Sequence, residues 1–239
     1  DADAAAFTAD TIAPFPESAA VRMDNTLALY GMNCLCGKAE HTKGCLDLWN
    51  GERRVCMPWT SGSTLPNATS GNYYLTRKVT LSATQTLKAN AVVALDLNGY
   101  TVTGPNNTRM YATQNTGTSL TITDNSAAQT GKLLARGTNF VGIKSTCIWV
   151  RYGEFNLLGG TLDASQTVYQ GNWDGSVVER NGGVIYLEAN RTANIYGGTI
   201  IGTNAKATTI NGNAVPAPSG GSIYVPSGAT LNMYGGTIE

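Results

Sequence analysis

The chain has 239 residues, of which only 13% are charged, and its 16 Lys and Arg residues balance its 16 Asp and Glu residues. Because no basic patch stands out, we expect no nucleic-acid partner. No apolar run approaches the ~18 residues that a membrane-spanning helix needs, so we expect no membrane insertion. The 28 glycines and the many Thr and Asn residues suit an extracellular protein of short strands and tight turns.

Residues 1–33 form the first predicted unit, an N-terminal arm without regular periodicity. Residues 34–69 form the second, a Cys/His-rich capping module. Its candidate metal ligands have the spacing C-x-C-x4-H-x3-C, which can place three thiolates and one imidazole around a tetrahedral zinc ion. We therefore expect one structural zinc, bound by Cys34, Cys36, His41 and Cys45.

Disulfide bonds are the alternative for this cluster. Cys45 would then pair with Cys56, and a second bridge would start from Cys34 or Cys36. Cys34 and Cys36 are too close in sequence to bridge each other comfortably. Cys56 is also the substitute if one predicted zinc ligand is wrong, and free thiols are a third reading. The fifth cysteine, Cys147, lies on a predicted strand, where we expect a buried and inert thiol.

Residues 70–239 form the third predicted unit, within which the sequence repeats itself. Residues 182–200 read GGVIYLEANRTANIYGGTI, and residues 220–238 read GGSIYVPSGATLNMYGGTI, a shift of 38 residues. A more diverged copy occupies residues 147–162. Apolar residues alternate along each copy, as they do along β-strands, and a fixed period of this length indicates a solenoid. The sequence therefore predicts an all-β fold, a parallel β-helix behind the Cys/His-rich cap.

The repeat also predicts which residues lie above one another in successive turns of the solenoid. Ile185 should lie over Ile223. Asn156, Asn194 and Asn232 should align as well. The predicted equivalent inward positions are Leu97, Ile122, Leu157, Ile195 and Met233.

Two 19-residue segments, 163–181 and 201–219, leave the repeat at the same point. Insertions on one face of a solenoid often form its binding face. The first segment combines aromatic rings with charged groups, which suits stacking on sugar rings and hydrogen bonds to hydroxyls. Alternatively, Trp173 only fastens the segment to the body. The candidate ligand-binding residues are Tyr169, Trp173, Asp174, Glu179 and Arg180.

Two further candidates, Tyr186 and Tyr224, lie on the strands themselves. If Ile185 points into the core, Tyr186 points outward, and Tyr224 does the same one repeat later. Trp149 joins them if its copy contains one inserted residue. Such an aromatic ladder could bind an extended glycan, so both tyrosines are candidate ligand contacts. The alternative is a ladder that only packs stacked strands together.

The order of motifs resembles a known family. CLCGKAEHTKGC at 34–45 precedes MPWTSGSTLPNATSGNYYLTRKVT at 57–80, ALDLNGYTVTG at 94–104 and the Gly-Gly-Thr-Ile repeats. This order, over about residues 34–239, resembles the N-terminal part of large, adhesin-like repeat proteins that anaerobic gut bacteria secrete or attach to their cell wall. The resemblance implies a right-handed β-helix and a secreted or cell-surface location. The chain departs from the pattern at Asp96, where relatives often carry Cys.

These observations favour an extracellular adhesin-like binding module. Its expected partner is a glycan or glycoprotein on a host or bacterial surface or in the environment, or a host protein such as immunoglobulin. The alternatives are a structural spacer that displays other domains and a β-helix polysaccharide-degrading enzyme. Glycoside hydrolysis needs two carboxylates roughly 5–10 Å apart, and acids predicted to face outward from strands are few. We therefore expect no enzyme and no catalytic residue among Asp96, Asp124, Glu154 and Glu188.

The last predicted feature is the C-terminal end of the repeat. The chain ends at Glu239, directly after a Gly-Gly-Thr-Ile and without the 19-residue segment that follows the earlier copies. An uncapped solenoid would expose unpaired backbone groups and core side chains. We expect the natural protein to continue with further repeats, and its signal peptide to lie outside this sequence.

Overall fold

The computed structural model describes residues 56–126, 128–137, 146–167, 183–203, 208–210, 213–215 and 221–239. In these ranges the regular structure consists of strands alone. No helix long and apolar enough to cross a membrane occurs among them. The prediction of an all-β chain is therefore confirmed for the described residues.

Most strands belong to three parallel sheets. The first contains β1 (Cys56–Trp59), β2 (Gly71–Leu75), β5 (Val92–Asp96), β8 (Ser119–Thr123), β11 (Glu154–Leu157), β14 (Thr192–Ile195) and β19 (Thr230–Met233). The second contains β3 (Val79–Thr80), β6 (Thr101–Asn106), β9 (Lys132–Gly137), β12 (Thr161–Thr167), β15 (Thr199–Ile201) and β20 (Thr237–Ile238). The third contains β4 (Gln85–Thr86), β7 (Tyr111–Thr113), β10 (Ile148–Val150), β13 (Ile185–Leu187) and β18 (Ile223–Tyr224).

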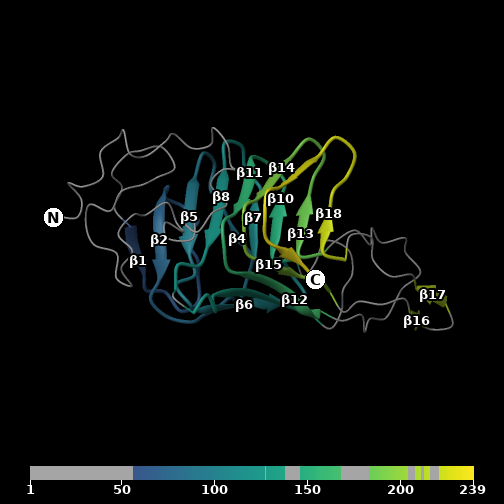
Figure 1. Cartoon of the computed structure of the whole chain (residues 1–239), viewed down its shortest axis with the longest axis horizontal. Coiled ribbons are helices and arrows are strands. Elements are labelled where there is room, and N and C mark those ends of the chain that lie inside the picture. Colours follow the sequence, from purple (N-terminus) through teal and green to yellow (C-terminus); the bar gives the residue numbers. More distant parts are fainter. Residues whose placement is uncertain are drawn as a thin grey trace.

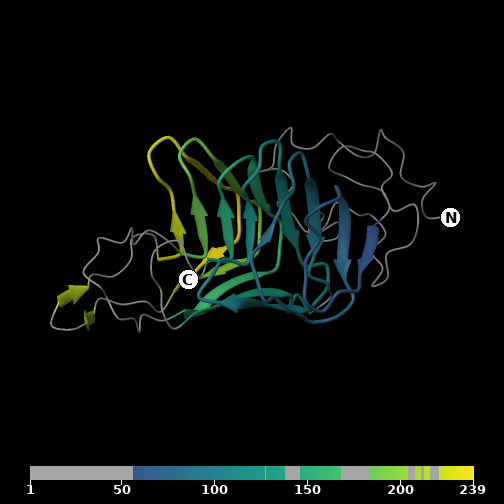
Figure 2. The same ribbon diagram turned by 180° about the vertical axis from the view of Figure 1, so that it is seen from behind.

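From β2 onward the chain visits the three sheets in a fixed order. β2, β3 and β4 belong to the first, second and third sheets, and β5 returns to the first sheet beside β2. The order repeats to β20, and the strands of each circuit pair in parallel with those of the circuit before. Figure 1 shows the strands following one another along the long axis. Figure 2 shows the same succession from behind.

The register between circuits agrees with the repeat in the sequence. Ile185 pairs with Ile223, as predicted. The three aligned asparagines are also confirmed, because Asn156 pairs with Asn194 and Asn194 with Asn232. The equivalence of Leu97 with Ile122 was wrong. Leu95 is the partner of Ile122, because β5 ends at Asp96 and Leu97 already belongs to the turn that follows.

The core is a single apolar cluster that runs through all circuits, from Leu65 to Ile200. Leu95, Ile122, Leu157 and Ile195 are all fully buried in it. Met233, which pairs with Ile195, is 45% exposed because β19 is the last described strand of its sheet. Cys147 is a free thiol with no exposed surface, as predicted. Burial raises the pKa of this thiol to about 12.

The second glycine of each Gly-Gly-Thr motif makes the turn into the second sheet. Gly160, Gly198 and Gly236 have φ values of 82°, 86° and 88°, a left-handed conformation that L side chains rarely adopt. They also approach the circuit beneath them closely. A Cβ atom on Gly198 would lie 2.6 Å from the carbonyl oxygen of Gly160. The motif therefore repeats because both the turn and the stacking require glycine.

Three boundaries differ from those in the sequence analysis. The parallel pairing begins with β1 at Cys56, before residue 70, because residues 56–59 pair with residues 72–75. The segment 163–181 is not all loop, since β12 continues to Thr167. The segment 201–219 contains an antiparallel pair that periodicity did not reveal, β16 (Thr208–Ile210) and β17 (Asn213–Val215).

Candidate functional site

Several predicted site residues lie outside the described residues. These include the candidate zinc ligands Cys34, Cys36, His41 and Cys45, and the loop candidates Tyr169, Trp173, Asp174, Glu179 and Arg180. Within the described ranges no group of three or more His, Cys, Asp or Glu residues could hold a metal ion. The zinc site and the loop contacts therefore stay predictions.

The aromatic ladder forms on the outer side of the third sheet. Trp149 pairs with Tyr186 and Tyr186 with Tyr224, as the repeat predicted. The rings of Tyr186 and Tyr224 stack with centroids 4.8 Å apart. With Ala112, Trp149 and Tyr186 form a small buried cluster separate from the core, and Tyr186 is only 5% exposed. The burial supports the packing interpretation of this ladder, whereas the ligand role of the two tyrosines stays a prediction.

A second ladder runs along the first sheet. Asn194 donates a hydrogen bond to Asn156 Oδ1 and accepts one from Asn232, both 2.8 Å long. The neighbouring rings of Tyr196 and Tyr234 stack with centroids 5.0 Å apart. Burial, followed by the influence of Tyr234 and then of Glu154, raises the pKa of Tyr196 to about 12. These contacts join like side chains of successive circuits and so stabilise the stacking of strands.

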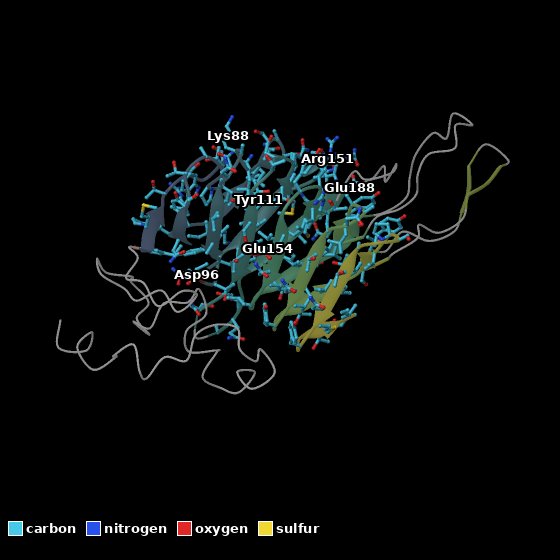
Figure 3. The ribbon with its side chains drawn as sticks, turned by 90° about the horizontal axis from the view of Figure 1, so that it is seen from above. Lys88, Asp96, Tyr111, Arg151, Glu154 and Glu188 are labelled. Atoms are coloured by element: carbon cyan, nitrogen blue, oxygen red, sulfur yellow. The ribbon has the colours of Figure 1, made fainter. Side chains whose placement is uncertain are left out.

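The accessible site lies beside the first ladder, at the corner between the third and first sheets. An open cleft of about 440 Å³ is lined by Trp149, Arg151, Tyr152, Glu188, Ala189 and Arg191. We call it the Trp149 cleft. Its lining comes from the ends of β10 and β13 and the turns that follow them. Figure 3 shows Arg151 and Glu188 on the same side of the molecule, opposite Asp96.

Two turns position the cleft residues. Gly153 follows Tyr152 with φ of 66°, and a Cβ atom there would lie 1.7 Å from the carbonyl oxygen of Thr118. The backbone N–H of Tyr152 donates to Thr113 of the preceding circuit over 2.7 Å. In the next circuit Asn190 makes the equivalent turn with φ of 61°. Close stacking of the two corners therefore brings Tyr152 and Arg191 together.

Three arginines surround the aromatic rings of the cleft. The guanidinium of Arg109 lies 3.7 Å from the ring centre of Trp149. That of Arg151 lies 5.6 Å from Trp149 and 5.8 Å from Tyr152. The guanidinium of Arg191 lies 5.1 Å from the ring of Tyr152. Each distance is within the ~6 Å range of an attractive cation–π contact.

One carboxylate, Glu188, faces this group. Its Oε1 atom accepts a hydrogen bond of 3.1 Å from the indole N–H of Trp149. Burial lowers the pKa of Arg109. The negative charge of Glu188 raises this pKa, and the positive charge of Arg151 lowers it further. Among the described residues, the Nε atoms of Arg109 and Arg191 are buried and make no hydrogen bond. The lining of the cleft therefore contains two arginines and one carboxylate, and a third arginine, Arg109, packs on Trp149.

Sequence reasoning missed most of this cleft. Trp149 was noted for the ladder and Glu188 as a strand acid, but Tyr152 and the three arginines were not. The arginines are contributed by three different circuits, so no run of basic residues exists in the sequence. The available signal was positional, because segments 151–153 and 188–191 occupy the same corner of two successive copies and both carry Arg.

The strand acids have structural partners. Asp96 and Asp124, two of the acids expected to face outward, are 0% and 2% exposed. Asp124 accepts hydrogen bonds from the backbone N–H groups of Gly99 and Gly131 over 2.8 and 2.6 Å. Asp96 accepts from the N–H of Asn98 over 2.8 Å. Periodicity missed their burial because both carboxylates bind the amides of turns that follow the strands.

Comparisons with protein-family models, with curated proteins and with solved structures find no match to this chain. The resemblance to adhesin-like repeat proteins therefore rests on the motifs in the sequence and stays a prediction.

Proposed function

We propose that this chain is an extracellular, adhesin-like binding module that holds a glycan, free or on a glycoprotein, in the Trp149 cleft. The module is a right-handed parallel β-helix that presents the cleft at one of its corners. The same site would serve a host, bacterial or environmental glycan.

The sheet topology supports the β-helix. Each circuit contributes one strand to each of three sheets, and all neighbours within those sheets are parallel. Parallel strands joined by crossover connections are right-handed in nearly all known cases. A continuous core with contacts mainly between neighbouring circuits is the arrangement that stabilises solenoids.

The observation that carries the functional proposal is the composition of the Trp149 cleft. Tyr152 offers a half-buried ring, and Arg151 and Arg191 place donors around it. A sugar ring has an apolar face that packs on an aromatic side chain and hydroxyl groups that hydrogen-bond to charged donors and acceptors. A small number of polar groups around an aromatic surface is typical of ligand-binding sites.

The carboxylates favour binding over hydrolysis. Asp96 and Asp124 are buried and bound by backbone amides. Glu154 accepts a hydrogen bond from Ser119 over 3.1 Å, and Glu188 accepts one from Trp149. A hydrolase needs a pair of carboxylates free to act on the same bond, and these four groups are used in holding the structure together.

A glycan array tests this proposal. We expect the wild-type chain to bind a restricted set of glycans without cleaving them. Replacement of Tyr152 by Ala should weaken binding about fivefold or more, because a stacked ring contributes about 1 kcal/mol. Tyr234→Ala is the matched control, since Tyr234 is a partly exposed ring on the first sheet. Absence of binding across the array, or release of shortened sugars, would refute the proposal.

A further inference from the structure

We propose that the Trp149 cleft selects saccharides that carry an anionic substituent, either a carboxylate or a sulfate ester. This inference rests on the proposed function, that the cleft binds a glycan, and adds the chemical class of that glycan.

The first step is the charge at the cleft. Arg109, Arg151 and Arg191 bring three guanidinium groups to the rings of Trp149 and Tyr152. Glu188 is the only carboxylate that lines the cleft among the described residues. The chain as a whole is neutral, so this excess of positive charge is local.

The second step is the availability of these cations. Within the described part of the chain, Arg151 and Arg191 have no carboxylate within ion-pair distance, and their guanidinium groups lie over aromatic rings. Arg151 is exposed and Arg191 half-buried. The Nε atom of Arg191 is buried without a hydrogen-bond partner. An anion in the cleft would contact the accessible parts of these guanidinium groups, since the buried Nε atom is out of its reach.

The third step is geometry. A guanidinium held near a ring by cation–π attraction can still donate N–H groups to a carboxylate or sulfate. Arg151 and Arg191 both lie over Tyr152, with their guanidinium groups 5.8 and 5.1 Å from its ring centre. A sugar packed against Tyr152 therefore places a substituent within reach of both arginines.

Titration calorimetry with paired probes tests this inference. Trigalacturonate is compared with its methyl ester, and lactose 3′-sulfate with lactose, so that the members of each pair share a sugar backbone and only one carries the anionic group. We expect at least one anionic probe to bind about tenfold or more tightly than its neutral partner. The preferred pair distinguishes a carboxylate from a sulfate ligand. High salt should reduce the preference.

Substitution of the arginines links the preference to the cleft. Arg151→Gln and Arg191→Gln should each weaken binding of the anionic probe more than binding of its neutral partner, and so remove most of the preference. Arg151→Lys should retain part of it, because the charge remains but the planar fork is lost. Arg77→Gln, which removes an exposed arginine that follows β2, should change nothing. Circular dichroism confirms that each variant is folded.

The outcomes separate the inference from the proposed function. Equal binding of charged and neutral probes would overturn anion selection and leave glycan binding intact. Failure of every array glycan and every probe to bind would overturn both. Equally tight binding of a hexaglutamate peptide would also overturn the inference, because the cleft would then recognise charge without sugar. If both Gln variants still preferred the anionic probes, the selectivity would lie outside the Trp149 cleft, and the assignment of anion binding to Arg151 and Arg191 would be wrong.

Discussion

Replacement of Gly198 by Ala should destabilise the chain strongly, although it adds one methyl group. Gly198 has φ of 86°, which costs an L-residue about 1–2 kcal/mol. The new Cβ would lie 2.6 Å from the carbonyl oxygen of Gly160 in the circuit beneath. Because that neighbour is backbone, relief requires the circuits to separate, and such overpacking costs about 1–3 kcal/mol. Alanine also lowers the conformational entropy of the unfolded chain, which offsets about 0.4–1 kcal/mol of the destabilisation.

The expected loss is therefore about 1–5 kcal/mol in the free energy of unfolding, from the sum of these terms. Urea unfolding followed by circular dichroism measures it. Gly221→Ala is the matched control, because no atom lies within 4 Å of its new Cβ, and we expect no loss there. A Gly198→Ala midpoint equal to that of the wild type would refute the reasoning that links the Gly-Gly-Thr motif to stacking.

Four further outcomes are expected. Asn194→Ala should lower the free energy of unfolding by about 1–3 kcal/mol, because it removes two hydrogen bonds and leaves the buried Asn156 oxygen unpaired. Asn232→Ala removes one hydrogen bond and should lower it less. A larger loss for Asn232→Ala than for Asn194→Ala would contradict the role of the asparagine ladder. Cys147, whose pKa is raised to about 12 by burial, should resist iodoacetamide at pH 8.5 until urea unfolds the chain, as peptide mass spectrometry would show. Because the pKa of this thiol is higher in the folded chain than in the unfolded chain, the unfolded chain loses the proton first as the pH rises. The free energy of unfolding should therefore fall between about pH 9 and about pH 12. The purified chain should contain one zinc ion, and a Cys45–Cys56 disulfide without metal would refute that prediction.

The parts of the fold that could be predicted are those in which one circuit copies another. The register of Ile185 on Ile223 followed directly from the 38-residue shift. Earlier circuits have diverged in length, and there the equivalence of Leu97 with Ile122 was wrong. Alternation fixes which side of a strand a residue faces, but it does not fix where the strand ends.

The candidate site was harder to predict, for a physical reason. The Trp149 cleft is made by residues that stacking brings together from separate circuits, such as Arg109 and Arg191. Each is unremarkable in its own sequence context. Likewise the acids Asp96 and Asp124 are typical of an exposed strand in sequence, yet turn amides bury them. Predicting such contacts requires knowing which turn residues lie above one another in successive circuits, as well as which strand residues pair.

Hydroxyl-radical footprinting tests whether the Trp149 cleft is the binding site. The chain is oxidised with and without saturating trigalacturonate, and the modification of each tyrosine and tryptophan is read by mass spectrometry. We expect the ligand to reduce the oxidation of Tyr152 severalfold and to leave the oxidation of Tyr234 unchanged. Unchanged oxidation of Tyr152, with protection confined to Tyr169 and Trp173, would contradict it and return the binding site to the segment 163–181.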